Sequence, residues 1–493
     1  MIFLYIGLPL LVAAILPLVG KISKRFLPDL LANGVFLTLF VLAVTSGRRL
    51  IGSGPVLQQF RWMGEDTGIA LAVDGFSLFM LMAIALITLC VGLYSINYME
   101  HYGSKSVYYA LLLMMMTGMN GLVLAADLFQ VYLFLEVAAI ASYALVAYGL
   151  EYDELEASFK YLMLSVVASA AILMAIAIIF GMTGGVGFAA VAEGLRALDS
   201  RAAVGFCSAL FIMGFGLKAA LVPFHAWLPD AHPSAPAPIS AILSGLLIKV
   251  SGVYALTRIF FNVFGLTPAL SEVLMWTGMV SIVVAALLAV GQPDMKRMLA
   301  YSSISQVGYV VLGIGLGTPL GIAGGLFHLF NHAVAKGLLF LNSGAVQQAT
   351  GTRELDQMGG LAKRMPLTAG TSLVGSLSIV GVPPLAGFWS KLLIIIALVQ
   401  ARQGTLAVLA VLASVITLWY YLIFQRKAFF GKLEERWKDV KEAPFWMSAA
   451  TVILALISIG VGIFFAATIR SWIQPAADAL SLGVQAALSI GGF

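Results

Sequence analysis

Charged side chains are scarce in this sequence, at 10% of its 493 residues, whereas hydrophobic residues make up 61%. Soluble globular domains carry about 25% charged residues, so the composition excludes a chain that is solvated mainly by water. The mean hydropathy of +1.00 supports the same conclusion. The net charge of +5 does not indicate a nucleic-acid partner, because the placement of the basic residues explains it better. We therefore expect an integral membrane protein whose main solvent is lipid.

Cysteine residues and cofactor motifs are also lacking. Cys90 and Cys207 both lie in apolar runs and match no metal or haem spacing, so we predict two small buried hydrophobic residues. There is no cysteine cluster for an iron–sulfur centre and no glycine-rich nucleotide fingerprint after a strand. The sequence therefore predicts neither a cofactor nor a metal.

Long apolar runs, by contrast, are abundant. A window of about 19 residues finds about fourteen of them, separated by short loops. Their approximate starts are Ile2, Leu31, Ser77, Tyr109, Leu128, Lys160, Ala203, Ile239, Ser271, Leu299, Leu320, Leu367, Thr405 and Phe445. Each run far exceeds the ~10 residues of a membrane β-strand. We predict an all-α polytopic membrane protein with about 14 transmembrane helices and no soluble domain.

The basic residues divide unequally between the two sets of alternating loops. With the N-terminus outside, sixteen Lys and Arg residues, among them Lys105 and Lys296, fall on the inner side. Eight, among them Arg258, fall on the outer side. Because inner loops carry the excess of basic residues, this orientation is favoured. The first apolar run has basic residues only after it, which predicts a spanning helix and not a cleaved signal.

Five ionisable residues lie inside the apolar runs. Lys218, Lys249, Lys336 and Lys391 lie well within predicted helices, and Glu136 lies near the middle of the fifth. A charge at the bilayer centre costs at least ~2.5–3.5 kcal/mol, so such residues face the bundle interior and often mark a pathway. A structural ion pair or a snorkelling side chain can explain one such residue, but it explains five on five helices poorly. Lysine can also release its proton when buried and regain it beside a carboxylate.

The eleventh run carries a second pattern. His328, His332 and Lys336 are spaced i, i+4, i+8, which places them on one helical stripe about 12 Å long. Histidine can relay protons near neutral pH. Two histidines at this spacing also suit zinc, but zinc needs further ligands and a nearby lysine repels the cation. Polar groups that only join helices are another alternative. The stripe favours a proton wire.

Two of the predicted helices are interrupted near a lysine. Pro223 follows Lys218 by five residues, and Pro383 and Pro384 precede Lys391 by a few. Proline removes a backbone donor, and non-helical backbone at membrane depth is tolerated only where protein or water satisfies it. Two interrupted helices, one in each half of the chain, indicate a transporter built from inverted repeats with its site at the breaks.

Several motifs together resemble a known family. They are GLKAALVPFHAWLPDAHPSAP, SGLLIKVSGVYALTRI, KRMLAYSSISQVGY, FHLFNHAVAKGLLFL and GVPPLAGFWSK. The chain is similar to the antiporter-like membrane subunits of respiratory complex I, energy-converting membrane-bound hydrogenases and multisubunit Na⁺/H⁺ antiporters. The resemblance covers nearly the whole chain. It implies a bacterial or archaeal cytoplasmic membrane, and two inverted five-helix repeats in which helices 7 and 12 are broken.

The resemblance also implies an organisation and a role for each site residue. The ranges are 1–106 for helices 1–3, 107–262 for the first repeat, 263–430 for the second, and 431–493 for the last helix and a short amphipathic tail. Glu136 pairs with Lys218, Lys249 connects inward, the stripe of the eleventh helix bridges the halves, and Lys391 is the terminal proton site. Further polar residues that are candidates to line the path are His225, Ser302, Ser303, Ser305 and Gln306.

The implied function is proton translocation, with Na⁺ left open, within a complex of other membrane subunits in lipid. Any electron transfer then belongs to those partners. The position of Lys391 resembles the D-type antiporter subunit and its hydrogenase counterpart, whereas the FHAWLPDAHPSAP wording is closer to the hydrogenase and complex I types. An autonomous cation/proton antiporter remains the alternative. A passive scaffold ranks last, because it has no use for buried ionisable groups.

Overall fold

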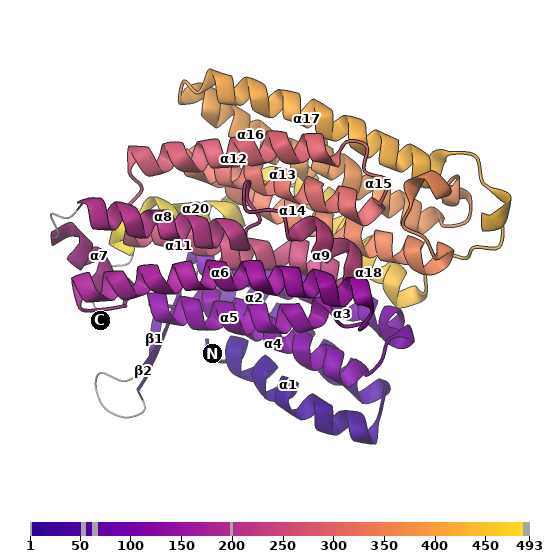
Figure 1. Cartoon of the computed structure of the whole chain (residues 1–493), viewed down its shortest axis with the longest axis horizontal. Helices are drawn as coiled ribbons and strands as arrows, with labels where there is room; N and C mark the ends of the chain where they lie inside the picture. The colour runs from indigo at the N-terminus through magenta and orange to yellow at the C-terminus, as the bar shows by residue number, and fades with distance from the viewer. Residues whose placement is uncertain (1, 51–55, 62–67, 198–200, 487–493) are drawn as a thin grey trace.

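The structure is a computed structural model that describes residues 2–50, 56–61, 68–197 and 201–486. Most helices run roughly parallel along the long axis of the molecule (Figure 1). The first group is α1 (Leu4–Ile22), α2 (Phe26–Leu50), α3 (Gly75–Tyr98), α4 (Lys105–Leu124), α5 (Leu128–Val146), α6 (Tyr152–Thr183) and the short α7 (Phe188–Ala197). In this group α3 and α4 are the most deeply buried, whereas α1 and α2 lie at the periphery.

The centre of the chain contains an interrupted helix followed by a continuous buried rod. The interrupted helix consists of α8 (Arg201–Lys218) and α9 (Leu228–Ser234), with the backbone between them non-helical. The rod runs through α10 (Ala237–Ile242), the π-helical η2 (Leu243–Tyr254), α11 (Ala255–Arg258) and the π-helical η3 (Ile259–Val263). Its whole length is buried inside the protein, so none of its faces contacts lipid.

The second half repeats the pattern of long helices with one interruption. Its elements are α12 (Pro268–Ala289), α13 (Met295–Gly315), α14 (Pro319–Thr350), α15 (Pro366–Val380), α16 (Ala386–Gln400), α17 (Gly404–Gln425, continued by η6 to Phe430), α18 (Phe445–Ile463), α19 (Phe465–Thr468), η8 (Ile469–Ile473) and α20 (Gln474–Ser481). The backbone is non-helical between Val380 and Ala386. The expected broken helices are therefore present, one in each half.

Side chains at the helix starts explain several of these boundaries. Asp74, Asp127 and Asp294 each accept a hydrogen bond from a backbone N–H in the first turn of α3, α5 and α13. Such a cap satisfies one of the donors that a helix start leaves free. Gly351 and Gly381 end α14 and α15 with positive φ angles, a conformation that glycine adopts without steric cost.

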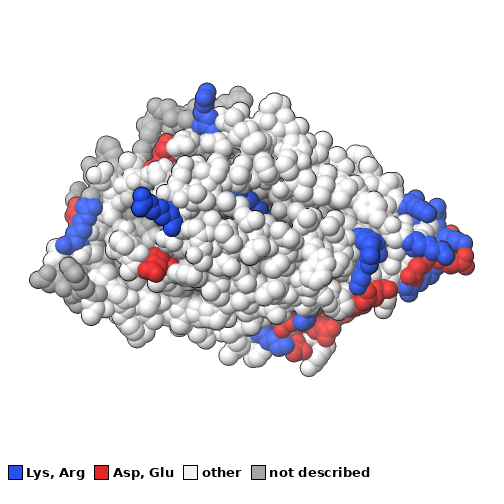
Figure 2. All heavy atoms as spheres, turned by 90° about the horizontal axis from the view of Figure 1, so that it is seen from above, with Lys and Arg blue, Asp and Glu red and all other residues white. Residues whose placement is uncertain are grey.

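The helices suit a membrane. Within the described residues, eleven helices are long and apolar enough to cross a membrane. Three shorter apolar helices lie at Ala202–Lys218, Pro366–Val380 and Ala386–Gln400. The predicted polytopic helical protein is confirmed at this level. The 32-residue α14 is long enough to cross but is not one of the eleven, because His328, His332 and other polar residues lower its hydropathy. Figure 2 shows a broad uncharged belt with charged side chains gathered mainly toward the two ends.

Two strands were not expected from the sequence. β1 (Val56–Arg61) and β2 (Gly68–Val73) form an antiparallel hairpin in which Val56 is opposite Val73. Leu71 of β2 also forms an isolated bridge with Ala125, just before α5. The hairpin therefore joins the α2–α3 connection to the α4–α5 connection.

Three basic residues for which the sequence predicts loop positions are in fact buried. Lys105 is 4% exposed, Lys296 is 1% exposed and Arg258 is 6% exposed. Each has an acceptor inside the protein: Lys105 Nζ lies 2.8 Å from Asp29, and Arg258 Nη1 lies 2.6 Å from Asp74. Without Lys105 and Lys296 on the inner side and Arg258 on the outer side, the basic residues still divide two to one in favour of the inner side. The orientation with the N-terminus outside stays a prediction.

A buried polar cluster fastens the C-terminal segment to α3. Arg258 donates to both carboxylate oxygens of Asp74, at 2.6 and 2.8 Å. Burial opposes ionisation of Asp74, but the Arg258 guanidinium prevails and holds the pKa of that carboxyl below its usual value. Asn262 donates to the Gly483 carbonyl at 2.9 Å, and a side chain at Gly75 would collide with the Pro475 carbonyl. The expected tail therefore packs on α3, and residues 487–493 lie outside the described part.

Candidate functional site

Glu136 and Lys218 form an ion pair between α5 and α8. Lys218 Nζ lies 3.5 Å from Glu136 Oε1. Two serines of α6 complete the pair: Ser165 Oγ accepts from Lys218 Nζ at 2.5 Å, and Ser169 Oγ donates to Glu136 Oε1. The Lys218 side chain is 2% exposed, whereas the Glu136 side chain is 25% exposed. The lysine is thus enclosed by the protein, and the carboxylate opens toward the outer surface of α5.

The first break leaves backbone groups that the surrounding side chains satisfy. Lys218 is the last residue of α8. The Leu217 carbonyl accepts from Trp227 Nε1 at 3.0 Å, and the Val222 N–H donates to Ser281 Oγ of α12 at 3.0 Å. Buried backbone groups that lack partners are costly, so these two contacts allow a non-helical segment next to a buried ammonium group.

Lys249 lies in the π-helical stretch of the buried rod and is fully buried. Its Nζ donates to the Ser244 carbonyl. Ser244 Oγ in turn lies 2.7 Å from Ser303 Oγ of α13, where either hydroxyl can be the donor. π-helical turns are rare and frequently occur at functional sites. The contact joins the lysine of the first half to a helix of the second half.

The histidines of α14 lie in line and are fully buried. The rings of His328 and His332 are nearly parallel, with centroids 6.5 Å apart. His328 is held at both nitrogens, by Ser390 Oγ at 2.9 Å and Gln306 Oε1 at 3.2 Å. Neither ring nitrogen of His332 has a hydrogen-bond partner within the described part of the chain. Buried polar groups normally have a partner, so His332 is available to water or a moving proton.

Lys336 continues this stripe and contacts both α13 and α17. Its Nζ donates to the Leu299 carbonyl at 3.0 Å and to Tyr421 Oη at 2.9 Å. Tyr421 Oη lies 3.1 Å from Ser302 Oγ, which also accepts from Tyr420 Oη at 2.9 Å. A chain of hydroxyls therefore leads from the lysine along the face of α17.

Lys391 follows the second break. Its Nζ donates to the Val380 carbonyl at 3.2 Å, which is one of the carbonyls at the end of α15. The ammonium position also lies 4.8 Å from the centre of the Tyr309 ring, a favourable cation–π distance. The side chain is buried, and Pro383 and Pro384 lie between the two helix segments, as expected.

The five further polar candidates divide into three groups. Gln306 contacts His328 directly, whereas Ser302 and Ser303 contact Tyr421 and Ser244, which in turn bond to Lys336 and Lys249. Ser305 does not, because its hydroxyl donates to the Ile282 carbonyl of α12 at 3.0 Å. His225 lies half-buried in the first break, and its Nδ1 has no hydrogen-bond partner among the described residues. No group of three or more His, Cys, Asp or Glu residues in the described part of the chain can hold a metal ion.

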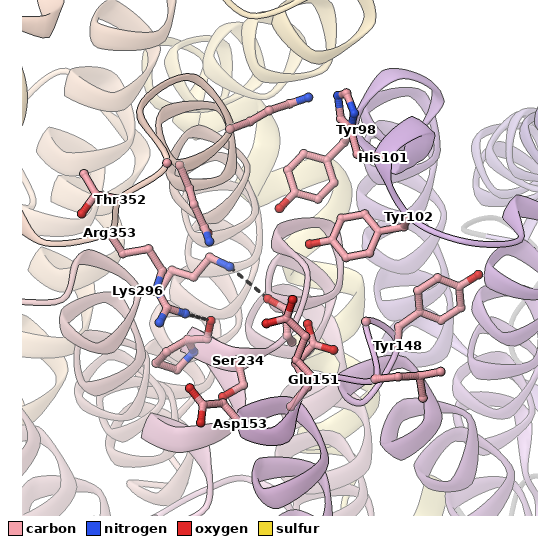
Figure 3. A pocket seen from close by; sticks show the side chains of 18 of the residues that line it. Tyr98, His101, Tyr102, Tyr148, Glu151, Asp153, Ser234, Lys296, Thr352 and Arg353 are labelled. Carbon is pink, nitrogen blue, oxygen red and sulfur yellow. Dashed lines mark hydrogen bonds between the residues drawn. The ribbon is translucent and has the colours of Figure 1, made fainter. Parts of the chain in front are cut away.

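Two further buried ionisable residues were not indicated by the sequence, and one of them lines a cavity. Lys296 lines a cavity of about 940 Å³ at the loop end of the molecule (Figure 3). His232 of α9 is fully buried and stacks on Phe340, with ring centroids 4.5 Å apart. The sequence predicts a loop position for Lys296 and no role for His232. Their positions in the quoted motifs, directly beside buried segments, are the only signal for them.

Known families match over most of the chain. Residues 125–417 match the family described as "NADH:quinone oxidoreductase/Mrp antiporter, TM", and residues 62–109 match the "NADH-Ubiquinone oxidoreductase (complex I), chain 5 N-terminus" family. The chain belongs to the antiporter-like subunit family. This assignment confirms the resemblance inferred from the motifs.

Three relatives illustrate which proteins this chain is similar to. NADH-quinone oxidoreductase subunit N of Desulforudis audaxviator is 33% identical over 85% of this chain and 84% of its own length. The D-type Na⁺/H⁺ antiporter subunit of Alkalihalophilus pseudofirmus is 32% identical over 88% of this chain and 87% of its own. A chain in the Mrp complex from Dietzia superposes with a TM-score of 0.91, 28% identity and 99% coverage of both chains. The identities are nearly equal, so they do not separate the subtypes.

Proposed function

We propose that this antiporter-like protein is the proton-translocating subunit of a multisubunit membrane complex, in which protons move along a row of buried ionisable side chains. The row consists of Glu136, Lys218, Lys249, His328, His332, Lys336 and Lys391. The observation that supports this most directly is that these side chains, all buried except the partly exposed Glu136, lie at the two helix breaks, in the buried rod and along one stripe of α14. Each member can accept or release a proton at a nitrogen or oxygen, and no cofactor takes part.

The architecture proposed for this path has about fourteen crossings, with the N-terminus outside a bacterial or archaeal cytoplasmic membrane. Residues 107–262 and 263–430 form two inverted five-helix repeats, each with one broken helix. The breaks let water and unpaired carbonyls reach membrane depth. Lys218 and Lys391 lie at these breaks, and the stripe on α14 connects them.

Partner subunits are supported by the exposure of one carboxylate. The Glu136 side chain is 25% exposed, and the exposed apolar residues Leu133 and Ile140 lie one turn away from it on either side along α5. A carboxylate at membrane depth does not face hydrocarbon without a large cost. We propose that a partner subunit covers this face, as expected for a relative of a chain in the Mrp complex.

The runner-up function is an autonomous secondary cation/proton antiporter. It uses the same row but leaves Glu136 toward lipid, which is why it ranks second. A passive scaffold ranks last, because it has no use for buried ionisable groups. If the protein were a scaffold, removing these groups would leave transport by the complex unchanged. Redox chemistry, where present, takes place in the partners, and Na⁺, where it is moved, is a counter-transported ion.

The test is proton transport by the purified complex in proteoliposomes, with and without a Na⁺ gradient. Glu136→Ala or Lys218→Ala should abolish transport while the complex still assembles. The chain offers a matched control in Lys105 and Asp29, a second buried ion pair at 2.8 Å between α4 and α2, which lies away from the row. Lys105→Met with Asp29→Asn should leave transport near normal. Near-normal pumping in both row variants would contradict the proposal.

A further inference from the structure

A small pocket lies between the ends of α12 and α17. Its volume is about 290 Å³, close to the lower limit of the ~300–1,000 Å³ that is usual for small-molecule sites. α17 lies along one edge of the molecule (Figure 1), and Trp419, which lines the pocket, is 55% exposed. The pocket therefore opens at the surface. Most of its wall is apolar and includes Ala289, Met298, Leu355, Ile423 and Phe424.

The surface around this pocket is apolar, as expected for a face that contacts lipid chains. Val415 and Leu422 of α17 and Leu287 of α12 are each more than half exposed, and α17 has no charged residue along its 22 residues. Trp419 lies near the end of this helix, and tryptophan is enriched where the hydrocarbon of a membrane meets the head groups. The pocket therefore lies at the depth of the head groups and the first part of the acyl chains.

Two basic side chains, Arg426 and Lys427, line the pocket where α17 ends. Lys427 forms an ion pair with Asp356. The exposed Arg426 side chain forms neither a hydrogen bond nor an ion pair with any described residue, so it supplies an unpaired positive charge. A guanidinium group binds phosphate through two parallel N–H donors, and basic pockets between transmembrane helices bind phospholipid head groups. The pocket thus fits a ligand that carries both a phosphate and a hydrocarbon chain.

One wall of the pocket connects to the proton row. Tyr420 lines the pocket and is 3% exposed, and its Oη donates to Ser302 Oγ at 2.9 Å. Ser302 Oγ lies 3.1 Å from Tyr421 Oη, which accepts from Lys336 Nζ at 2.9 Å. The hydroxyls of Ser302 and Tyr421 therefore link Tyr420 to a lysine of the row. A ligand that packs against the Tyr420 ring fixes one end of this chain of hydroxyls.

We propose that this pocket binds an anionic phospholipid, with the phosphate on Arg426 and the first part of one acyl chain against the apolar wall. A free phosphate leaves the apolar wall unfilled, and a zwitterionic lipid brings a second positive charge toward Arg426, which lowers its affinity. The bound lipid holds the Tyr420 ring in place, and with it the chain of hydroxyls that ends at Lys336. The binding site depends only on the pocket and its charges, whereas the effect on the row rests on the proposed function.

The first experiment measures binding at this pocket in the purified complex. Phosphatidylglycerol with a photoreactive group in its acyl chain should label the end of α17. Unlabelled phosphatidylglycerol should compete, phosphatidylcholine should compete less well, and glycerol 3-phosphate should not compete. Arg426→Gln should reduce labelling about fivefold, as expected for the loss of one basic contact. Ile423→Trp fills the pocket but keeps both basic residues, and it should reduce labelling as well.

Lys441→Gln is the matched control for this experiment. It removes the same charge from an exposed loop residue that does not line the pocket, so labelling should stay at the wild-type level. Unchanged labelling in Arg426→Gln or in Ile423→Trp would overturn the site, as would equal competition by phosphatidylcholine. Displacement by glycerol 3-phosphate would show a site for phosphate alone. Absence of labelling in the wild-type complex would show that another subunit covers the pocket, and either result contradicts a lipid site.

The second experiment measures the effect of the lipid on proton transport. In proteoliposomes of phosphatidylcholine, added phosphatidylglycerol should raise transport by the wild-type complex about two- to tenfold, on the scale of one hydrogen bond. Arg426→Gln should lose this increase, and Lys441→Gln should keep it. Tyr420→Phe retains the ring that the lipid contacts but lacks the hydroxyl, so it should keep the labelling and lose the increase.

The two experiments separate the possible failures. Equal wild-type transport in both lipid mixtures would overturn the link from the lipid to the row, even where labelling shows that the lipid binds. A wild-type complex that moves no protons in either mixture contradicts the proposed function instead, and the labelling result then decides the lipid site by itself.

Discussion

The two broken helices hold their lysines in different ways. Lys218, at the end of α8, lies 3.5 Å from the Glu136 carboxylate and donates to Ser165. Lys391, within α16, has no ion pair among the described residues and contacts only neutral groups, the Val380 carbonyl and the Tyr309 ring. A full opposite charge stabilises an ammonium group more than a carbonyl and an aromatic face do. The comparison shows that Lys218 has a carboxylate beside it, whereas Lys391 has only neutral polar and aromatic groups.

This difference fits a division of labour along the path. The ion pair of Glu136 and Lys218 is sensitive to any neighbouring charge that moves the carboxylate, because Lys218 loses its counter-charge when the Glu136 carboxylate moves away. Lys391 responds to wetting of the second break, because water and freed carbonyls there decide whether its charge is tolerated. In the proposed function, the protonation of Lys218 therefore depends on a partner subunit, and Lys391 is the site from which protons leave the path.

The largest expected effect comes from substituting the lysine of the second break with a residue that cannot lose its charge. Lys391→Arg should be as damaging to transport as Lys391→Ala, because arginine stays protonated throughout. Lys391→Glu should retain part of the activity, since a carboxylate in that setting can also titrate. Proteoliposome transport, with assembly checked in parallel, measures all three variants. Full activity of Lys391→Arg would show that a fixed charge suffices at the second break.

A slightly smaller effect is expected from the stripe that connects the two breaks. His332→Ala and Lys336→Ala should each slow transport, because they interrupt transfer between the halves while leaving both lysine sites in place. Zinc chelators should have no effect on the wild type. Inactivation by a chelator that added zinc reverses would favour the metal alternative and remove the connection on which the comparison depends.

The comparison also predicts a difference in thermodynamic coupling. In a double-mutant cycle, Glu136→Gln and Lys218→Met should couple by about 1 kcal/mol or more, as contacting charged residues do. Lys391→Met and Tyr309→Leu should couple by less, because a cation–π contact is weaker than a buried ion pair. The measurement is the free energy of unfolding of the four variants of each cycle. Equal coupling at the two sites would mean that their environments do not differ in the way proposed.

The smallest effect separates two neighbouring serines of α13. Ser303→Ala should reduce transport about two- to tenfold, because its hydroxyl contacts Ser244 beside Lys249. Ser305→Ala should leave transport within about twofold of the wild type, because its hydroxyl bonds to the α12 backbone. These ratios correspond to the loss of one ordinary hydrogen bond or less. A reversed order of the two variants would show that the path runs along a different face of α13.

Much of the helical architecture could be predicted from the sequence, because a charge or a proline inside an apolar run is costly and so stands out. Glu136, Lys218 and Lys391 were found in this way, and both helix breaks lie where Pro223, Pro383 and Pro384 interrupt the runs. The stripe on α14 followed from helical spacing alone. These signals depend on local sequence, which is why they needed no knowledge of the fold.

Features that depend on tertiary contacts could not be predicted. Lys105 and Lys296 lie at the ends of apolar runs, where a loop position is expected, and only the packed structure shows that they are buried. His232 lies among prolines and has no pattern that marks it as buried and unpaired. The hairpin of β1 and β2 lies in the connection between α2 and α3, which was expected to be a loop. The partial exposure of Glu136 depends on which helices pack beside α5.

The open side of Glu136 sets a condition on how the protein is produced in the cell. In the proposed complex, a copy whose α5 and α6 no partner covers presents the partly exposed Glu136 carboxylate to lipid, which is unfavourable. An unassembled copy is therefore chemically distinct from an assembled one, although the chain and the fold are the same. In the proposed function, the residue that carries protons in the finished complex therefore also distinguishes an unassembled copy from an assembled one.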